Sequence, residues 1–217
     1  MITVEGRSLK SRNVGWLVAL MLLDIVAMAA FVIPGLLSNM SVSALMLLRA
    51  VAVMLLPVVV LLLSGLLSSD VKAMLVFWKL KNVLPGHEAF SKHAGADSRI
   101  DLATLRRNVG AFPLDPKEQN AMWYRLYKKV GNDASVAEAH RMFLLFRDMS
   151  AVSILLFAIG PLGLWLSGIA SAAIAVAAAM LFGQFLWAAI AARSSGVRFV
   201  TTVLALHSAK RVTASSK

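Results

Sequence analysis

The stretch VGWLVALMLLDIVAMAAFVIPGLL, Val14 to Leu37, is apolar enough and long enough to cross a lipid bilayer as a helix. A bilayer with a hydrocarbon core of about 30 Å needs about 20 helical residues to span it. Three further runs have the same character: Val42 to Leu67, Met149 to Leu166 and Ser171 to Ala192. The sequence therefore predicts an all-α integral membrane protein with four transmembrane helices.

The composition agrees with a membrane location, because 59% of the residues are hydrophobic and the mean hydropathy is +0.76. A soluble domain carries roughly 45 to 50% apolar residues. The first run has an alternative interpretation as a cleaved signal peptide, since Arg7, Lys10 and Arg12 precede it and Ala27-Met28-Ala29 resembles a cleavage site. The apolar part of a signal peptide is about 7 to 15 residues long, so we interpret this longer run as a membrane span.

The distribution of positive charge predicts the orientation in the membrane. Of the 22 Lys and Arg residues, three precede the first run, thirteen lie between the second and third, and five follow the fourth. The connections 38–41 and 167–170 carry no charge. By the positive-inside rule, both termini and the long polar segment are expected in the cytoplasm, and a bacterial inner membrane is the expected location.

This orientation gives two transmembrane hairpins with a small helical cytoplasmic domain inserted between helices 2 and 3. The expected parts are an N-terminus 1–13, a first hairpin 14–67, the domain 68–148, a second hairpin 149–192 and a C-terminal tail 193–217. The chain has no cysteine, so a disulfide framework and a thiolate metal site are excluded.

Helix-start signals predict the elements of the inserted domain. Asp101 is placed to cap a helix that stops at Gly110. Asp115, followed by proline at the first helical position and by Glu118, predicts a second helix. Ser135 has a glutamate three residues later and is interpreted as the cap of a helix that leads into the third span.

Two other segments of the polar regions have less definite patterns. Ser69-Asp70 is expected to cap a helix that runs through Val83, and this helix either prolongs the second span or lies on the membrane surface. Residues 87–98 are expected to form a loop. The tail is expected to form a helix that packs on the domain or lies in the membrane interface, with strand as the alternative for Phe199 to Val203.

Two charged residues fall inside the predicted spans. Asp24 is close to the bilayer midplane and Arg49 is seven residues into the second run, so an ion pair between them is geometrically possible. Such a charge costs about 2.5 to 3.5 kcal/mol on insertion scales and normally finds a partner. Three interpretations remain open: a packing ion pair, a proton or ion site centred on Asp24, and an unpaired, neutral Asp24.

Small residues at four-residue spacing mark one face of the fourth span. Ala175, Ala179 and Gly183 form this stripe, and Gln184 adjoins it. Small residues allow another helix to approach closely. The stripe is expected to pack on the third span, and contact with a second copy of the chain is the alternative.

The polar segment has no pattern that predicts catalysis. Its histidines lack the i, i+4 spacing of two zinc ligands on one helix, and no glycine-rich phosphate loop is present. No catalytic residue, metal or cofactor is therefore expected. One group of basic and aromatic residues is the candidate docking site for a cytoplasmic protein or ligand: Arg106, Arg107, Trp123, Arg125, Lys128 and Lys129. The alternative is a plain solvated helix face, because cations are favoured at helix C-termini in any case. Nucleic acid is not expected as a partner.

These observations favour a non-enzymatic, homo-oligomeric membrane protein. Its cytoplasmic domain would sense or dock a partner, and its spans would anchor it, transmit a signal or form a pore. An effector of stress or antiviral defence is one role of this kind. The alternative is a proton- or ion-conducting subunit that uses Asp24, and a lipid-modifying enzyme is disfavoured because no convincing set of acid, base or metal ligands is present.

The predicted orientation can be tested with reporter fusions. Green fluorescent protein and alkaline phosphatase, each inserted within residues 87–98 and at the C-terminus, should give fluorescence without phosphatase activity at both positions. Phosphatase activity at either position would contradict the orientation.

Overall fold

The computed structural model describes residues 11–37 and 43–209 of the chain. The predictions made for Arg7, Lys10 and the first outer turn, 38–41, lie outside the described residues.

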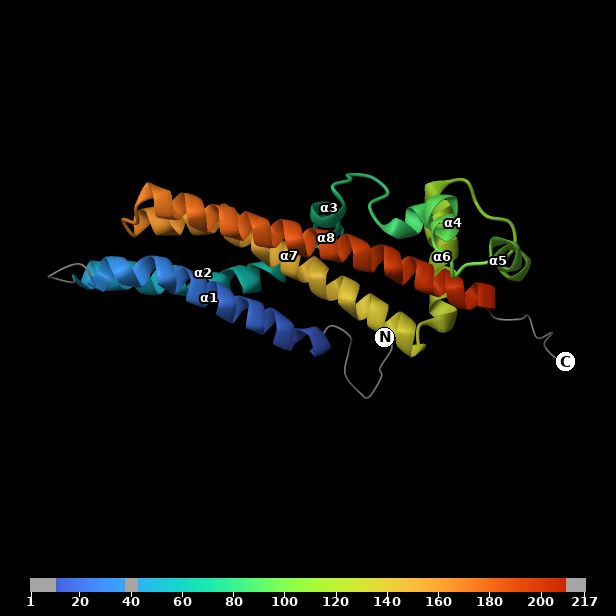
Figure 1. Cartoon of the computed structure of the whole chain (residues 1–217), viewed down its shortest axis with the longest axis horizontal. Helices are drawn as coiled ribbons and strands as arrows, with labels where there is room; N and C mark the ends of the chain where they lie inside the picture. Colours follow the sequence, from blue (N-terminus) through green and yellow to red (C-terminus); the bar gives the residue numbers. More distant parts are fainter. Residues whose placement is uncertain (1–10, 38–42, 210–217) are drawn as a thin grey trace. The chain divides into compact units, whose positions relative to one another are not determined.

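The described part of the chain is helical and contains no strand (Figure 1). Four of its helices are long and apolar enough to cross a membrane: α1 (Val14–Leu37), α2 (Ala44–Ser64), α7 (Ala134–Leu166) and α8 (Ser171–Ala209). An all-α protein with four candidate membrane-spanning helices is therefore confirmed. The orientation in the membrane remains a prediction.

The remaining elements are short. They are η1 (Ser11–Asn13), α3 (Ser69–Phe77), η2 (Pro85–Glu88), the π-helical turn η3 (Ala89–His93), α4 (Ala94–Ala96), α5 (Leu102–Val109) and α6 (Pro116–Val130). The expected loop at 87–98 is thus largely made of helical turns. The chain forms two compact units. The membrane unit contains 13–76 and 145–190, and the polar unit contains, among the described residues, 11–12, 77–144 and 191–209.

All four long helices contribute to the apolar core of the membrane unit. Val60 of α2 and Leu156 and Leu164 of α7 are fully buried in it. The closest approaches are made at two glycines of α7. A Cβ atom on Gly160 would lie 3.3 Å from a methyl of Leu181 on α8, and one on Gly163 would lie 3.4 Å from Val53 on α2. These glycines therefore let both neighbouring helices lie close to α7.

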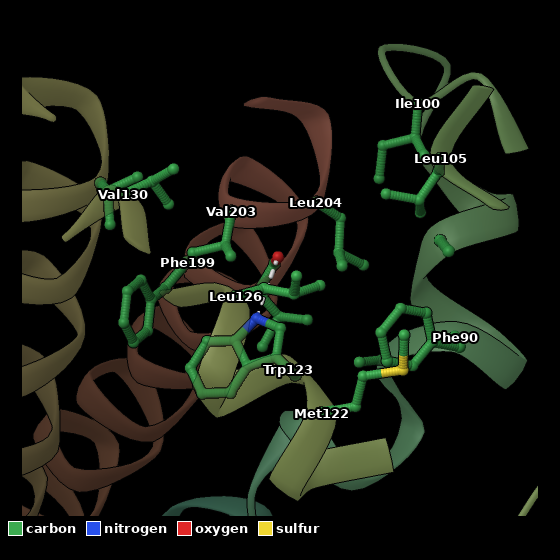
Figure 2. Packing of buried hydrophobic residues seen from close by; sticks show 14 of the residues in the cluster. Phe90, Ile100, Leu105, Met122, Trp123, Leu126, Val130, Phe199, Val203 and Leu204 are labelled. Atoms are coloured by element: carbon green, nitrogen blue, oxygen red, sulfur yellow. Dashed lines mark hydrogen bonds between the residues drawn. The ribbon is translucent and has the colours of Figure 1, made fainter. Parts of the chain in front are cut away.

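The polar unit has a separate core that includes the end of α8 (Figure 2). The Trp123 and Phe199 rings meet edge to face with their centroids 5.1 Å apart. The indole Nε1 of Trp123 donates to the Val200 carbonyl at 3.4 Å. Val203 and Leu204 are fully buried beside them. The tail is thus a helix of the polar unit, and the strand alternative for Phe199 to Val203 is wrong.

A glutamine joins α6 to the segment 89–93. Gln119 is 1% exposed, and its side-chain oxygen accepts from the backbone N–H groups of Phe90 and Ser91, both at 3.1 Å. Its amide nitrogen donates to the Leu114 carbonyl at 3.2 Å. A buried amide whose donor and acceptor are both used holds its neighbours in one position. Gln119 therefore fixes the π-helical turn against α6.

The sequence predicted two helix starts correctly and misplaced a third. The side chain of Asp101 caps α5 and that of Asp115 caps α6, as expected. Ahead of α7 the cap is Asp133 instead of Ser135, because the Asp133 carboxylate accepts from the N–H of Ser135 at 2.9 Å. Aspartate and serine both favour this position, so two candidates two residues apart are hard to separate by pattern alone.

The helix that Ser69-Asp70 was expected to cap has Ser68 as its cap, because the Ser68 hydroxyl accepts from the Val71 N–H at 3.3 Å, and the helix ends earlier than expected. It stops at Phe77, because Trp78 has a φ of 53° and no longer continues the right-handed helix. The residue types do not predict that the helix ends here, because tryptophan rarely adopts a positive φ.

A matched pair of leucines in α5 tests the core of the polar unit. Leu105 is fully buried and Leu102 is 44% exposed. Leu105→Ala should lower the free energy of unfolding by about 2 to 5 kcal/mol, because it leaves a cavity in a packed core. Leu102→Ala should lower it by less than about 1 kcal/mol. The measurement is thermal unfolding of the detergent-solubilised chain. Equal losses of stability in the two variants would contradict this packing.

Candidate functional site

A polar cluster lies inside the membrane unit and joins three of its helices. Asp24 of α1 is 1% exposed. The side-chain nitrogen of Gln184, on α8, lies 3.4 Å from the Asp24 carboxylate and donates to the hydroxyl of Ser153, on α7, at 3.0 Å. The Ser153 hydroxyl in turn donates to the Met149 carbonyl at 2.9 Å. Polar groups in hydrocarbon need such partners, so the cluster fixes how α1, α7 and α8 face one another.

The structure does not bring Arg49 to Asp24. Arg49 is exposed on α2, and none of the ion pairs between described residues joins it to Asp24. Asp24 lies 13 residues before the end of α1 and Arg49 five residues after the start of α2, which makes their heights differ by about 12 Å. A long arginine side chain near a helix end can extend its guanidinium to the membrane surface. Gln184, predicted only as a packing residue, is the side chain that contacts Asp24.

A second buried charge cluster was not predicted from the sequence. Lys72 of α3 and Arg147 of α7 each reach Oδ1 of Asp148 at 3.1 Å, and the Lys72 and Asp148 side chains are only 6% and 8% exposed. Lys72 and Asp148 are 76 residues apart, so no local spacing could reveal the pair. Removing one partner from such a cluster leaves a buried charge, which typically costs 3 to 5 kcal/mol. The cluster therefore ties α3 to α7 within the membrane unit.

The small-residue stripe does not face the third span. Ala175, Ala179 and Gly183 are all exposed, and a Cβ atom on Gly183 would meet nothing within 4 Å. The buried face of α8 carries Ala177 and Leu181 instead. Because α8 is apolar all round in this region, its composition does not indicate which face is turned inward.

The candidate docking residues divide into exposed cations and one core aromatic. Arg106 and Arg107 are exposed on α5, and Arg125, Lys128 and Lys129 are exposed on α6. Trp123 belongs to the core and is only 7% exposed, so its place in the predicted docking site is wrong. The helical period of α6 turns positions 122, 123, 126 and 130 toward the core, so the side chain of Tyr124 lies on the outer face.

The exposed aromatic of this region is Tyr124, which is 49% exposed. The Lys128 ammonium lies 5.4 Å from the centre of its ring. Together with Arg125 and Lys129 these residues form what we call the α6 basic face. None of its three cations forms an ion pair with any residue that the structure describes.

Two carboxylates that line cavities of the polar unit, Asp97 and Glu88, are paired with other cations. Hydrogen bonding from Arg99 holds the pKa of Asp97 well below its usual range. A hydrogen bond from Lys79 lowers the pKa of Glu88. Both groups are therefore ionised and paired at neutral pH, which makes them unsuited to donate a proton as a general acid. Within the described ranges, no three metal-ligating side chains gather at one place.

Comparison of the chain with protein-family models, with curated proteins and with solved structures finds no match. Function is therefore inferred from the residues of this chain. Two arrangements bear on it: the membrane cluster of Asp24, Ser153 and Gln184, and the α6 basic face.

The membrane cluster can be tested by removing its central amide. Gln184→Leu leaves the buried Asp24 carboxyl without its side-chain donor and should destabilise the chain by about 1 to 3 kcal/mol. Combining it with Asp24→Leu removes both polar groups and should recover much of that loss. The measurement is thermal unfolding in detergent.

Arg49→Gln is the matched control, because it changes an exposed polar residue of the spans and should alter stability by less than about 0.5 kcal/mol. If Arg49→Gln lowers the stability strongly and its effect is not additive with that of Asp24→Asn, the cluster is contradicted and an ion pair between Asp24 and Arg49 is supported.

Proposed function

We propose that this chain is a non-enzymatic membrane protein whose polar unit docks an acidic segment of another protein on the α6 basic face. The observation that supports this most directly is the set of three exposed cations, Arg125, Lys128 and Lys129, that have no carboxylate partner among the described residues. Cations at the end of a helix are favoured by the helix dipole alone. The helix dipole explains why the cations are present. The exposed ring of Tyr124 beside them adds contact area that a purely solvated helix face does not need.

The electrostatics favour an acidic partner. The chain has 22 basic and 11 acidic side chains, a formal net charge of +11, so its long-range field attracts negative charge. Such complementarity mainly raises the association rate and the specificity. Tyr124 supplies an amphipathic ring of the kind that is enriched at protein interfaces, and the Lys128 ammonium against it remains free to contact a carboxylate.

The rigid scaffold behind the face also supports docking. Met122 and Leu126 of the same helix are buried in the core of the polar unit, and Gln119 fixes the start of the helix. Side chains presented by a well-packed helix lose less freedom on binding than side chains of a loop. We infer that the long apolar helices anchor this unit in a bacterial inner membrane with the polar unit in the cytoplasm.

Self-association is part of the proposal. Ala175, Ala179 and Gly183 lie on an exposed face of α8 where a second copy of the chain could approach closely. A homo-oligomer would place several α6 basic faces in one assembly, which strengthens the binding of a partner that has repeated acidic segments. A signalling or defence effector could work in this way.

A binding experiment with an acidic probe tests the docking function. The full chain in nanodiscs of phosphatidylcholine, which carry no net charge, should bind a fluorescent polyglutamate peptide, and added salt should weaken the binding. Arg125→Glu combined with Lys128→Glu should weaken it by about ten-fold or more.

The matched control reverses two exposed cations outside the face, Lys81→Glu with Lys117→Glu, and should bind nearly as well as the wild-type chain. Equal losses in the two double variants, or no binding by the wild-type chain, would reject the α6 basic face as the docking site.

The second candidate function is a proton-conducting subunit centred on Asp24. One observation favours it: the buried carboxyl group has a neutral amide, Gln184, as its neighbour and pairs with no cation within 11–37 and 43–209, so it is free to change its protonation state. In proteoliposomes under a pH gradient, Asp24→Asn should then abolish a proton flux that the wild-type chain supports. Equal flux in both would reject this function.

A further inference from the structure

A small cavity of about 190 Å³ lies within the polar unit, away from the α6 basic face. It is bounded by the segment that follows α3, by η2 and η3, and by the first charged residue of α8. Its polar lining consists of Lys79, Glu88, Lys92, His93 and Arg193. Phe77, Pro85 and Val197 are among its apolar walls. A cavity of this size has room for several water molecules, or for a phosphate group with part of an attached headgroup.

The charges around this cavity leave an excess of two positive charges. Lys79, Lys92 and Arg193 are cations, and Glu88 is the one carboxylate among the lining residues. Lys79 donates to Oε1 of Glu88 at 2.5 Å, and Lys92 lies 3.5 Å from Oε2. Each ammonium group has three donors, so a single carboxylate cannot use them all. An anion that enters the cavity would therefore meet donors from three separate segments of the chain.

Arg193 is held in a fixed orientation at this cavity. Its guanidinium carbon lies 3.6 Å from the centre of the Trp78 ring. A cation on an aromatic face is stabilised by about 0.5 to 2 kcal/mol, and the stacking restricts the plane of the guanidinium. Trp78 has a φ of 53°, which tryptophan rarely adopts, so the backbone is strained immediately before Lys79. Strain of this kind is concentrated at ligand clamps and active sites.

A neighbouring cavity of about 440 Å³ shares His93 and Val197 but offers a weaker anion site. Its Arg99 is already bound to Asp97 at 2.7 Å and donates to Thr201 at 3.1 Å. The charges of Arg99 and Asp97 cancel, so Arg198 alone contributes net positive charge to the lining of the larger cavity. Burial lowers the pKa of His93, which therefore presents a neutral ring to both cavities. The larger cavity leaves room for the uncharged remainder of a ligand whose anionic group lies in the smaller one.

The sequence around the smaller cavity indicates where the anion comes from. Arg193 directly follows the apolar run that ends at Ala192. Trp78 and Leu80, 58% and 83% exposed, alternate with Lys79 and Lys81. Exposed aromatic and apolar side chains interleaved with cations are typical of a segment at the headgroup level of a membrane that contains anionic lipid.

We propose that this cavity binds the phosphate group of an anionic phospholipid, held by Lys79, Lys92 and Arg193. Ammonium and guanidinium groups that converge from different directions match a tetrahedral phosphate better than a planar carboxylate, which one arginine alone can satisfy. This site shares no residue with the α6 basic face. It gives the polar unit a lipid ligand in addition to a protein partner.

Native mass spectrometry of the full chain in detergent tests the site, with short-chain phosphatidylglycerol, short-chain phosphatidylcholine and inorganic phosphate as separate probes. Phosphatidylglycerol should bind. Phosphatidylcholine should bind more weakly, because its choline cation opposes the positive excess. Lys79→Gln combined with Lys92→Gln should weaken the binding of phosphatidylglycerol by about ten-fold or more. The control, Arg107→Gln with Lys117→Gln, removes two exposed cations outside the cavity and outside the segment of Lys79 to Lys81, and it should bind like the wild-type chain.

Two outcomes would overturn the proposal. Inorganic phosphate that binds as tightly as phosphatidylglycerol would show a soluble phosphate site instead of a lipid site. Equal binding by the cavity variant and the control would show that the lipid lies elsewhere. Thermal unfolding of each variant without lipid separates lost binding from lost folding, and Lys92→Arg, which keeps the charge, should retain the bound lipid.

Discussion

The structure depends on one constraint: inside hydrocarbon every polar group has to find its partner within the protein. The four long helices satisfy this for the backbone. For the side chains, Asp24 is placed against Gln184, and Gln184 against Ser153, so that each contact joins a different pair of helices. Lys72, Arg147 and Asp148, which lie outside the predicted spans, are likewise buried and paired with one another where α3 meets α7. These two clusters specify which faces meet, a choice that apolar surfaces alone leave open because lipid is as apolar as leucine.

The features that could be predicted from the sequence are those set by local chemistry. Apolar length identified the four spans, and the aspartates at 101 and 115 marked the starts of α5 and α6. The features that were missed depend on how the helices are rotated and placed. A span that is apolar on every side does not reveal its inner face, so the stripe at Ala175 was assigned inward although it is exposed. Arg49, of opposite charge, was predicted as the partner of Asp24, although the residue that contacts Asp24 is the uncharged Gln184.

Within the candidate sites the same distinction holds. The cations of the α6 basic face were identified because charge and helical period are both visible in the sequence. Trp123 was included wrongly because an aromatic residue beside cations is equally common in a core and at an interface. The cavity of Lys79, Lys92 and Arg193 could not be found in this way, since its lining residues come from segments about 100 residues apart. The strain at Trp78, which orients that residue against Arg193, has no signature in the residue types.

Gln119 stands between the two proposed sites. Its side-chain oxygen holds the backbone of the turn that carries Lys92 and His93, while its own backbone belongs to the helix that carries Arg125 and Lys128. Ordering of that turn by a bound headgroup would act on the start of α6 through this one amide. By thermodynamic reciprocity, a protein held on α6 would change the affinity for lipid by the same factor that lipid changes the affinity for the protein. If both proposed ligands bind, the attachment to a protein partner would therefore depend on the composition of the surrounding bilayer.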